Sequence, residues 1–252
     1  MSKKPKISFI IPAYNEEKLI ARCLEGILAQ IQKEDYAKHR FEIIVVNNAS
    51  TDRTRDIARD FLSVKVVDEP QKNLACARRT GARSAHGEIL AHVDADTVLT
   101  DQWIDVAFEE FSQNHNLVAL SGPYLYANLS AWRNFLVDLF YVSGFILYRL
   151  NKFLFKKGAM IQGGNFLVLN SAWQKLPQSD THFAFYGEDT ELAKALSDIG
   201  EVKFTFKLKI MTSARRLHKE GIITAGIRYA INYLWVLFFS KPFHTTHEDI
   251  RE

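Results

Sequence analysis

The chain has 252 residues, 47% of them hydrophobic, and its 32 Lys and Arg side chains against 29 Asp and Glu give a net charge of +3. That length fits one large domain, or one domain with a C-terminal extension. The charge is too balanced to indicate a nucleic-acid-binding protein, so we expect no nucleic acid among its partners.

The N-terminus and the cysteines indicate a cytoplasmic protein. Only the short apolar run at residues 7–11 follows the basic start before Pro12 interrupts it, and a signal peptide needs a longer apolar region. Cys23 and Cys76 lie at no metal-ligand spacing and are interpreted as reduced thiols. We therefore expect that the protein is not exported.

Strands and helices alternate along the N-terminal part of the chain. Apolar residues at helical spacing predict helices at 19–31 and 74–85, with another helix after residue 51. Short apolar runs predict strands at 7–11, 42–46, 64–67 and 88–93. This alternation predicts an α/β fold with a mostly parallel sheet and helices on both faces.

The fourth predicted strand ends in two carboxylates, Asp94 and Asp96. Side chains two residues apart in a strand point the same way, so this pair would project together beyond the strand. Open α/β sheets bind their ligands at that edge. Two converging carboxylates suit Mg²⁺ or Mn²⁺, which prefer oxygen ligands and keep substrate phosphates and water. Taken alone, such a pair is weak evidence for a site, because many such pairs are solvated turn residues.

Polar residues also follow the first two predicted strands, at 12–17 and 47–52. The three strands would deliver these residues to one edge of the sheet, as in a binding crevice. The sequence has no glycine-rich phosphate-binding loop, so a cation at the Asp pair would have to neutralise any phosphates. The pattern predicts a metal-bound nucleotide held without a glycine loop.

Over roughly residues 5–217 the chain resembles a family 2 glycosyltransferase of the GT-A fold, which is Rossmann-like. The matching segments are residues 12–17, 45–52, 77–78 with Gly81, 94–96, 163–165 and 187–189. Each segment is short, and it is their common order that carries the resemblance. It implies an inverting transferase that moves one sugar from a nucleoside-diphosphate sugar to an acceptor hydroxyl.

The resemblance implies a nucleotide site built from five residues. Pro12, Tyr14 and Glu16 would line the base and ribose pocket, and Arg78 matches a basic residue near the nucleotide or its diphosphate. Asn48 stands where the family usually has an aspartate that bonds the base. An amide donates as well as accepts, so base selectivity is less secure. Because the family uses uridine donors more often than guanosine donors, we expect UDP before GDP.

The resemblance also places the metal and the donor sugar. Asp94 would contact the ribose or the metal, and Asp96 would be the direct ligand of Mg²⁺ or Mn²⁺. Gly163, Gly164 and Asn165 would lie beside the donor sugar and the acceptor. At the two glycines the missing side chains would leave room for the substrates.

The chemistry needs a base on the acceptor side, and Gly187 precedes two acids at a predicted helix start, Glu188 and Asp189. Acidic residues in a first turn also complement the helix dipole, with no catalytic meaning. In the family the second acid is the base. Asp189 would then take the proton of the acceptor hydroxyl as it attacks the anomeric carbon, while Glu188 orients the acceptor. One such displacement inverts that carbon.

Three cationic or titratable residues follow the predicted strand at 209–212. Arg215 and Arg216 replace the Gln-x-x-Arg-Trp stretch of related processive synthases, which favours addition of a single sugar. Either arginine could hold the diphosphate, or serve as a surface or lipid-headgroup cation. His218 could be a third metal ligand, or simply a solvated or packed histidine.

Two apolar stretches, at 135–150 and 222–239, are too interrupted by polar residues to span a membrane. They fit amphipathic helices in a membrane interface, and they also fit packing on the domain or a dimer interface. On the membrane interpretation the protein binds peripherally at the cytosolic face. Its acceptor would then be a lipid or a lipid-linked sugar.

We expect a transferase domain at residues 1–220 and an amphipathic C-terminal helical segment at 221–252. The domain would divide into a nucleotide-sugar half at about 1–122 and an acceptor half at about 123–220.

Two other functions share some of these features. A sugar nucleotidyltransferase is also α/β and metal-dependent, but it opens with a glycine-rich loop, and residues 12–17 contain no glycine. A catalytically silent sugar-nucleotide-binding or scaffold protein is the other alternative. The presence of Asp94, Asp96 and Asp189 favours the enzyme over it.

Overall fold

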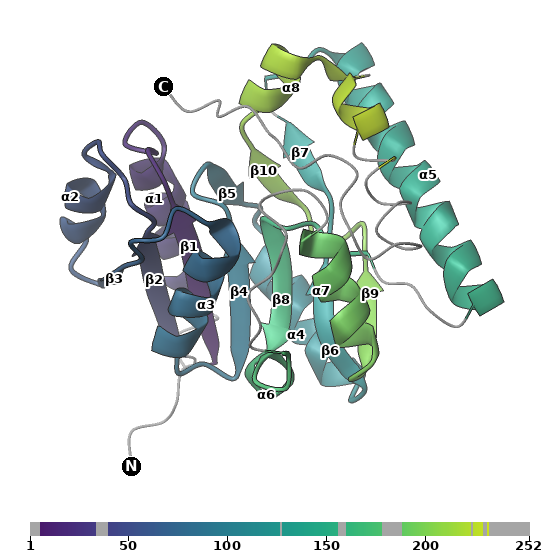
Figure 1. Ribbon diagram of the computed structural model, residues 1–252, viewed down its shortest axis with the longest axis horizontal. Helices are drawn as coiled ribbons and strands as arrows, with labels where there is room; N and C mark the ends of the chain where they lie inside the picture. The colour runs from purple at the N-terminus through teal and green to yellow at the C-terminus, as the bar shows by residue number, and fades with distance from the viewer. Residues whose placement is uncertain are drawn as a thin grey trace.

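A computed structural model describes residues 6–33, 40–126, 128–155, 160–177, 188–222, 224–228 and 231 (Figure 1). Gly187 and most of the predicted C-terminal segment lie outside the described residues. Cys23 and Cys76 are free in the described structure.

The central sheet has seven strands in the order β3-β2-β1-β4-β8-β6-β9. They are β1 (Ile7–Ala13), β2 (Phe41–Asn47), β3 (Val64–Asp68), β4 (Ile89–Val93), β6 (Leu117–Ser121), β8 (Asn165–Leu169) and β9 (Glu201–Phe204). Neighbouring strands are parallel except that β8 runs antiparallel to both β4 and β6. The predicted α/β fold with a mostly parallel sheet is confirmed.

A smaller sheet and eight helices complete the described structure. The small sheet pairs β10 (Ile210–Thr212) with β5 (Thr97–Leu99) and β7 (Tyr124–Tyr126). The helices are α1 (Ile20–Ile31), α2 (Thr54–Arg59), α3 (Leu74–Ser84), α4 (Trp103–Gln113), α5 (Ala131–Phe155), α6 (Asn170–Trp173), α7 (Glu188–Ser197) and α8 (Arg215–Glu220).

Helices cover both faces of the central sheet, as Figure 1 shows with α3, α6 and α7 in front and α1 and α4 behind. Alternate residues of β1 explain this layering, because successive side chains of a strand point to opposite faces. Phe9 and Ile11 pack with the α1 and α4 layer, whereas Ile10 packs with α3 and α7. The sheet is therefore buried on both sides.

The antiparallel register of β4 and β8 determines where the site forms. Val93, the last residue of β4, pairs with Asn165, the first residue of β8. The chain that leaves β4 toward Asp94 therefore lies beside the chain that enters β8 from Gly164. Two segments about seventy residues apart in the sequence meet at one edge of the sheet.

The long helix α5 packs on the edge of the domain by one face only. Val137 and Tyr141 are buried on that face and pack with Phe204 and Ala214. The opposite face exposes large apolar side chains, namely Trp132, Phe135, Leu139, Val142, Ile146, Leu147, Leu150 and Phe153. None of the helices within the described residues combines the length and apolar character needed to cross a membrane.

His92 in β4 is a fully buried histidine with no polar partner among the described residues. Its ring stacks between Phe166 and Trp173, at centroid distances of 4.5 and 4.7 Å. Burial, and next the charge of Arg78, hold the pKa of His92 well below its ordinary value of 6.5. The folded protein therefore keeps this imidazole neutral, whereas the unfolded chain can protonate it.

We expect His92→Phe to stabilise the protein, most strongly in acid. The unfolded wild-type chain binds a proton at His92 below pH 6.5 that the folded state does not, so wild-type stability falls with pH from that point. At pH 5 this residue should cost about 2 kcal/mol relative to pH 7.5. Urea denaturation at both pH values measures the difference, with exposed His115→Gln as control. An equal pH dependence in wild type and His92→Phe would contradict this account.

Candidate functional site

The parallel strands β1, β2 and β4 end at one edge of the sheet (Figure 1), so the polar residues that follow them lie at this edge, as predicted. Two left-handed residues shape the loops there, Asn15 at φ 50° and Ala49 at φ 59°. Side chains tie the loops together: the Thr51 N–H donates to Asn15 Oδ1 at 2.9 Å, and the Glu16 N–H donates to Thr54 Oγ1 at 2.7 Å. These bonds hold Glu16 in a defined position above the sheet.

The predicted base pocket contains Pro12 and Tyr14, which lie half-buried at the end of β1 and just beyond it. The Lys72 ammonium lies 3.8 Å from the centre of the Tyr14 ring. A cation over an aromatic face is an attractive contact. Lys72 belongs to the turn after β3, and sequence reasoning did not identify it.

Asn48 is buried, and its side-chain NH₂ donates to the backbone oxygens of Gln71 and Glu69, at 2.5 and 3.3 Å. An ionised aspartate has no hydrogen to donate and could not make either bond. The amide therefore anchors the turn after β3. This is a structural reason for an asparagine where the family usually has an aspartate.

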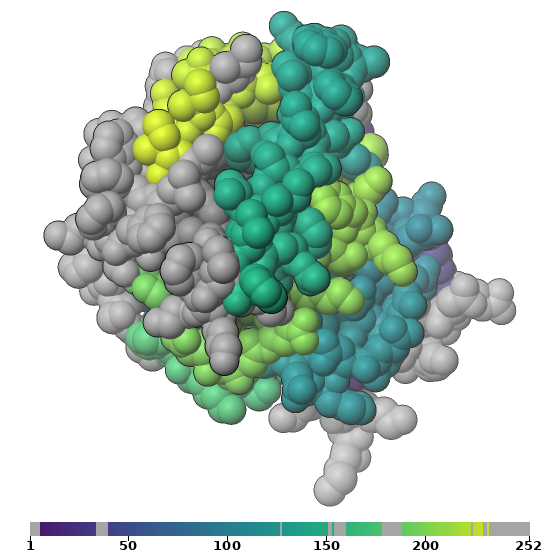
Figure 2. All heavy atoms as spheres, turned by 90° about the vertical axis from the view of Figure 1, so that its right-hand side faces the viewer, coloured from purple at the N-terminus to yellow at the C-terminus, as the bar shows by residue number. Residues whose placement is uncertain are grey.

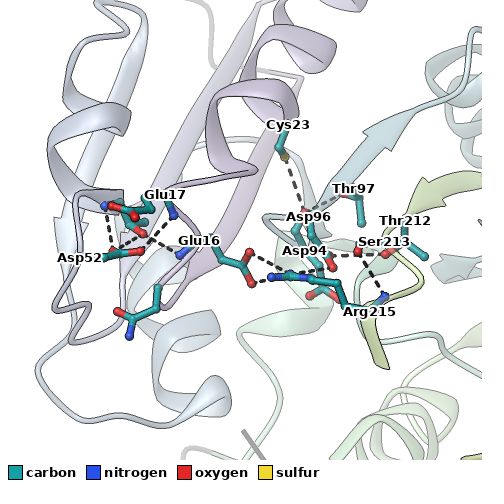
Figure 3. Close-up of polar contacts among 12 residues, drawn as sticks. Glu16, Glu17, Cys23, Asp52, Asp94, Asp96, Thr97, Thr212, Ser213 and Arg215 are labelled. Atoms are coloured by element: carbon teal, nitrogen blue, oxygen red, sulfur yellow. Dashed lines mark hydrogen bonds and ion pairs between the residues drawn. The ribbon is translucent and has the colours of Figure 1, made fainter. Parts of the chain in front are cut away.

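Glu16, Asp96 and Arg215 form one ionic cluster, shown in Figure 3. Arg215 Nη2 lies 2.9 Å from each Glu16 carboxylate oxygen and 3.0 Å from Asp96 Oδ2. The Thr212 hydroxyl donates to Asp96 Oδ1 at 3.4 Å. Glu16 was predicted to line the base and ribose pocket, and the structure instead pairs its carboxylate beside Asp96.

Asp94 is held from two sides. Its backbone N–H donates to the Gly164 oxygen at 3.4 Å, and the Tyr124 hydroxyl donates to its Oδ2 at 2.8 Å. Burial, and next the charge of Asp94, keep the pKa of Tyr124 well above its ordinary value of 10, so the phenol stays protonated and can donate. Tyr124 lies on β7 in an unremarkable apolar run, and no pattern in the sequence marks it.

Gly163 and Gly164 separate the Asp94 side of the site from the Asp189 side. A Cβ at Gly164 would overlap Asp94 and the Tyr124 hydroxyl, and a Cβ at Gly163 would overlap the Asp189 carboxylate. The Gly163 N–H also donates to Asp189 Oδ2 at 3.1 Å. Only glycine lets the backbone pass this closely between the two acids.

Asn165 was predicted to lie beside the donor sugar, but its side chain is fully buried behind the glycines. Its amide donates to the backbone oxygens of Leu208 and Gly122, at 2.8 and 3.0 Å, and accepts from the Trp103 indole at 2.8 Å. These bonds fasten β8 to its neighbours. The side chain therefore supports the site from the core, because all of these partners lie in the interior.

Arg78 was predicted to approach the nucleotide, yet it lies buried behind the two acids of α7. Its Nη1 lies 3.0 Å from Glu188 Oε1 and 3.2 Å from Asp189 Oδ1, and its Nη2 donates to the Gly163 oxygen at 2.6 Å. Arg78 thus offsets part of the negative charge of this acidic pair and fixes the pair against Gly163.

The two acids differ in exposure, since the Glu188 side chain is 9% exposed and that of Asp189 is 38% exposed. Burial of the Asp189 carboxyl against its neighbours raises its pKa from 3.8 to about 6, with Glu188 and Asp94 adding to the rise and Arg78 opposing it. Asp189 is therefore the acid that can both reach a ligand and exchange a proton near neutral pH.

The residues fit a divalent cation that completes its coordination with phosphate and water. Within the described part of the chain no group of three or more His, Cys, Asp or Glu is placed to hold a metal. Asp96 already faces a cationic group, the Arg215 guanidinium. Mg²⁺ and Mn²⁺ need only one or two protein carboxylates when a diphosphate supplies further oxygens. The part of His218 as a third ligand stays a prediction.

Of the two arginines, only Arg215 is described in contact with the site. Arg216 Nη1 lies 3.3 Å from Glu220 Oε1, one turn along α8, and Arg228 pairs with the same carboxylate at 3.0 Å. Arg215 therefore lies beside Asp96, and which of the two arginines holds the diphosphate stays a prediction.

Comparison with known proteins adds to this geometry. Residues 8–176 match the sequence profile described as glycosyl transferase family 2. Glycosyltransferase AglE of Haloferax volcanii is 39% identical over 110 residues, which span 41% of this chain and 34% of that protein. Dolichyl-phosphate beta-glucosyltransferase ALG5D of Trichomonas vaginalis is 34% identical over 102 residues, 37% of this chain and 31% of that protein. The similarity spans about a third of each relative.

Two solved structures share the fold. The mannosyltransferase PcManGT of Pyrobaculum calidifontis, in complex with GDP-Man and Mn²⁺, superposes with a TM-score of 0.65 at 20% identity, over 91% of this chain and 65% of that one. S. aureus TarS 1–349 in complex with UDP-GlcNAc gives 0.58 at 15% identity, over 94% of this chain and 76% of that one.

Proposed function

The chain belongs to glycosyl transferase family 2 and has the GT-A fold, and from this we propose that it is a metal-dependent, inverting glycosyltransferase that adds one sugar to an acceptor hydroxyl. Family membership makes it a glycosyltransferase and disfavours the sugar nucleotidyltransferase and the silent binding protein. The observation that carries the mechanism is the partly exposed Asp189 carboxylate beside Gly163, opposite the Asp94 and Asp96 pair.

Asp189 acts as the general base in this proposal. Its carboxylate accepts the acceptor's hydroxyl proton as the oxygen attacks the anomeric carbon from the face opposite the leaving diphosphate. The Gly163 N–H and Arg78 hold the carboxylate in one orientation. Glu188 balances the Arg78 charge and so keeps Asp189 basic enough to take the proton.

Asp96, with Asp94, would hold Mg²⁺ or Mn²⁺ at the donor site. When bound, the cation stabilises the negative charge that develops on the leaving nucleotide. Tyr124 orients Asp94 through its hydroxyl, and Thr212 orients Asp96. The presence of Mn²⁺ in the PcManGT complex supports a divalent cation here.

Tyr14 and Lys72 would receive the base, with Asn48 holding the floor of the pocket through the turn after β3. The structural neighbours bind GDP-Man or UDP-GlcNAc, so the fold accommodates both bases. We keep UDP before GDP for this chain.

Calorimetric titration with UDP and GDP, each with and without Mn²⁺, tests the donor site. We expect one nucleotide to bind in the presence of Mn²⁺ and to lose most of its affinity without Mn²⁺. The Asp96→Asn variant should show a similar loss of nucleotide affinity when Mn²⁺ is present. A nucleotide affinity that changes neither on removal of Mn²⁺ nor in Asp96→Asn would contradict the metal assignment. Absence of binding by either nucleotide would contradict the donor site.

The exposed apolar face of α5 supports a lipid-linked acceptor, because such a face can bind a membrane surface. Figure 2 shows α5 running across the surface turned toward the viewer, with the last described residues, in yellow, beside its upper part. Arg133 and Arg149 outnumber the single acid Asp138 among the described side chains of the helix, which favours an anionic lipid surface. ALG5D is named as a dolichyl-phosphate transferase. We propose that α5 lies on the cytosolic face of a membrane, with the protein bound peripherally.

A further inference from the structure

The Arg215 guanidinium lies beside the Asp96 carboxylate, where a metal ion bound to Asp96 would also place its positive charge. Its Nη2 contacts Asp96 Oδ2 at 3.0 Å and both oxygens of Glu16 at 2.9 Å (Figure 3). Glu16 is almost fully buried and Asp96 is 19% exposed, while Arg215 reaches them from the first residue of α8. One guanidinium thus bridges the loop after β1 and the loop after β4.

A divalent cation on Asp96 and a guanidinium on the same carboxylate oxygen exclude each other. The two positive groups would lie within a few ångström, where like charges repel strongly in a partly buried site. A cation that binds Asp96 through Oδ2 must therefore displace the Arg215 contact, and a cation on Oδ1 would still be repelled by the guanidinium on the other oxygen. When metal binds without nucleotide, breaking the Arg215 contact costs free energy and the arginine gains no new partner.

The present position of Arg215 also leaves one of its donors unused. Arg215 Nε is buried and has no hydrogen-bond partner among the residues that the structure describes. An unmade hydrogen bond at a buried donor costs about 1–3 kcal/mol. A diphosphate is an acceptor suited to the planar fork of arginine donors, including Nε. The diphosphate of a nucleotide at Asp96 would offer Arg215 Nε the hydrogen-bond acceptor that it lacks in this arrangement.

We propose that Arg215 is an exchangeable counter-ion: it neutralises Asp96 and Glu16 in the nucleotide-free protein and moves to the diphosphate when metal and nucleotide bind together. This exchange rests on the proposed donor site and adds a coupling between metal binding and nucleotide binding. Metal alone binds weakly because it competes with Arg215. Metal and nucleotide bind cooperatively because the nucleotide gives the displaced guanidinium a partner.

The test measures Mn²⁺ affinity from the electron paramagnetic resonance signal of free Mn²⁺, with no sugar and no turnover. It compares wild type, Arg215→Met and Lys219→Met, each alone and with UDP or GDP. Lys219 is exposed on the same helix, so its variant removes an equal charge away from Asp96. Circular dichroism confirms that each variant is folded.

We expect Arg215→Met to bind Mn²⁺ alone about tenfold more tightly than wild type, within the usual range of coupling between two sites. Lys219→Met should match wild type. The nucleotide should raise Mn²⁺ affinity strongly in wild type and much less in Arg215→Met. Equal Mn²⁺ affinity in wild type and Arg215→Met, with nucleotide still bound, overturns the exchange and leaves the proposed function standing.

If Arg215→Met fails to fold because Glu16 loses its partner, a second measurement on wild-type protein tests the exchange. In wild-type protein the Arg215 Nε–Hε resonance, assigned by its loss in Arg215→Lys, should shift on adding Mg²⁺ with the nucleotide and much less with Mg²⁺ alone. A resonance that does not move while the nucleotide binds overturns the exchange. If Mn²⁺ and nucleotide do not bind wild type at all, the donor site itself is wrong.

Discussion

Asp189→Asn should reduce turnover by about a thousandfold while leaving nucleotide affinity close to that of wild type. The amide keeps the size of the side chain and can still accept from the Gly163 N–H, but it cannot take the proton of the acceptor hydroxyl. Nucleoside diphosphate release in the presence of acceptor measures turnover, and calorimetry measures binding. Wild-type turnover in this variant would remove Asp189 as the base.

Glu188→Gln is the matched control, since it changes the neighbouring acid in the same way. Glu188 is buried against Arg78, so its amide should weaken the charge balance behind the site without removing the proton acceptor. We expect a smaller loss of turnover than in Asp189→Asn. The reverse order would assign the base to Glu188.

The pH profile carries a second signature of the same base. Burial raises the pKa of Asp189 to about 6, and the base works only when it is deprotonated. The wild-type kcat/KM should therefore fall about tenfold per pH unit below pH 6 and level off above it. The residual activity of Asp189→Asn should lack this inflection.

The double variant Leu139→Glu with Ile146→Glu should release the protein from anionic vesicles. Both side chains are more than half exposed on α5, at 54% and 52%. Burying the exposed half of each side chain in the lipid interface contributes about 1 kcal/mol, and each added carboxylate costs more to desolvate and is repelled by anionic headgroups. We expect at least about a hundredfold loss of partitioning in flotation with phosphatidylglycerol-containing vesicles.

Gln102→Glu with Asn116→Glu adds the same charge at exposed positions away from α5, and this control should float like wild type. Equal flotation of the α5 variant and wild type would contradict the membrane role. A wild-type dimer in sedimentation velocity that the α5 variant lacks would make this face a contact between two copies instead.

The amino-acid sequence by itself determined the alternation of strands and helices, the polar edge after β1, β2 and β4, and the order of short segments that marks the family. These are local properties, because strand period, turn residues and the Asp94 and Asp96 pair are each contained within a few consecutive residues. The sequence therefore also located the acids at the start of α7, although local pattern could not separate catalysis from helix-dipole complementation there.

Only the tertiary structure decided which of these residues act together. Arg78 sits behind Asp189, 111 positions away, and Arg215 reaches Glu16 across 199 positions. Asn165 turns into the core instead of the site because the antiparallel pairing of β4 and β8 fixes its direction. Such partnerships depend on strand register and helix packing over long separations, and no local pattern of residues encodes them.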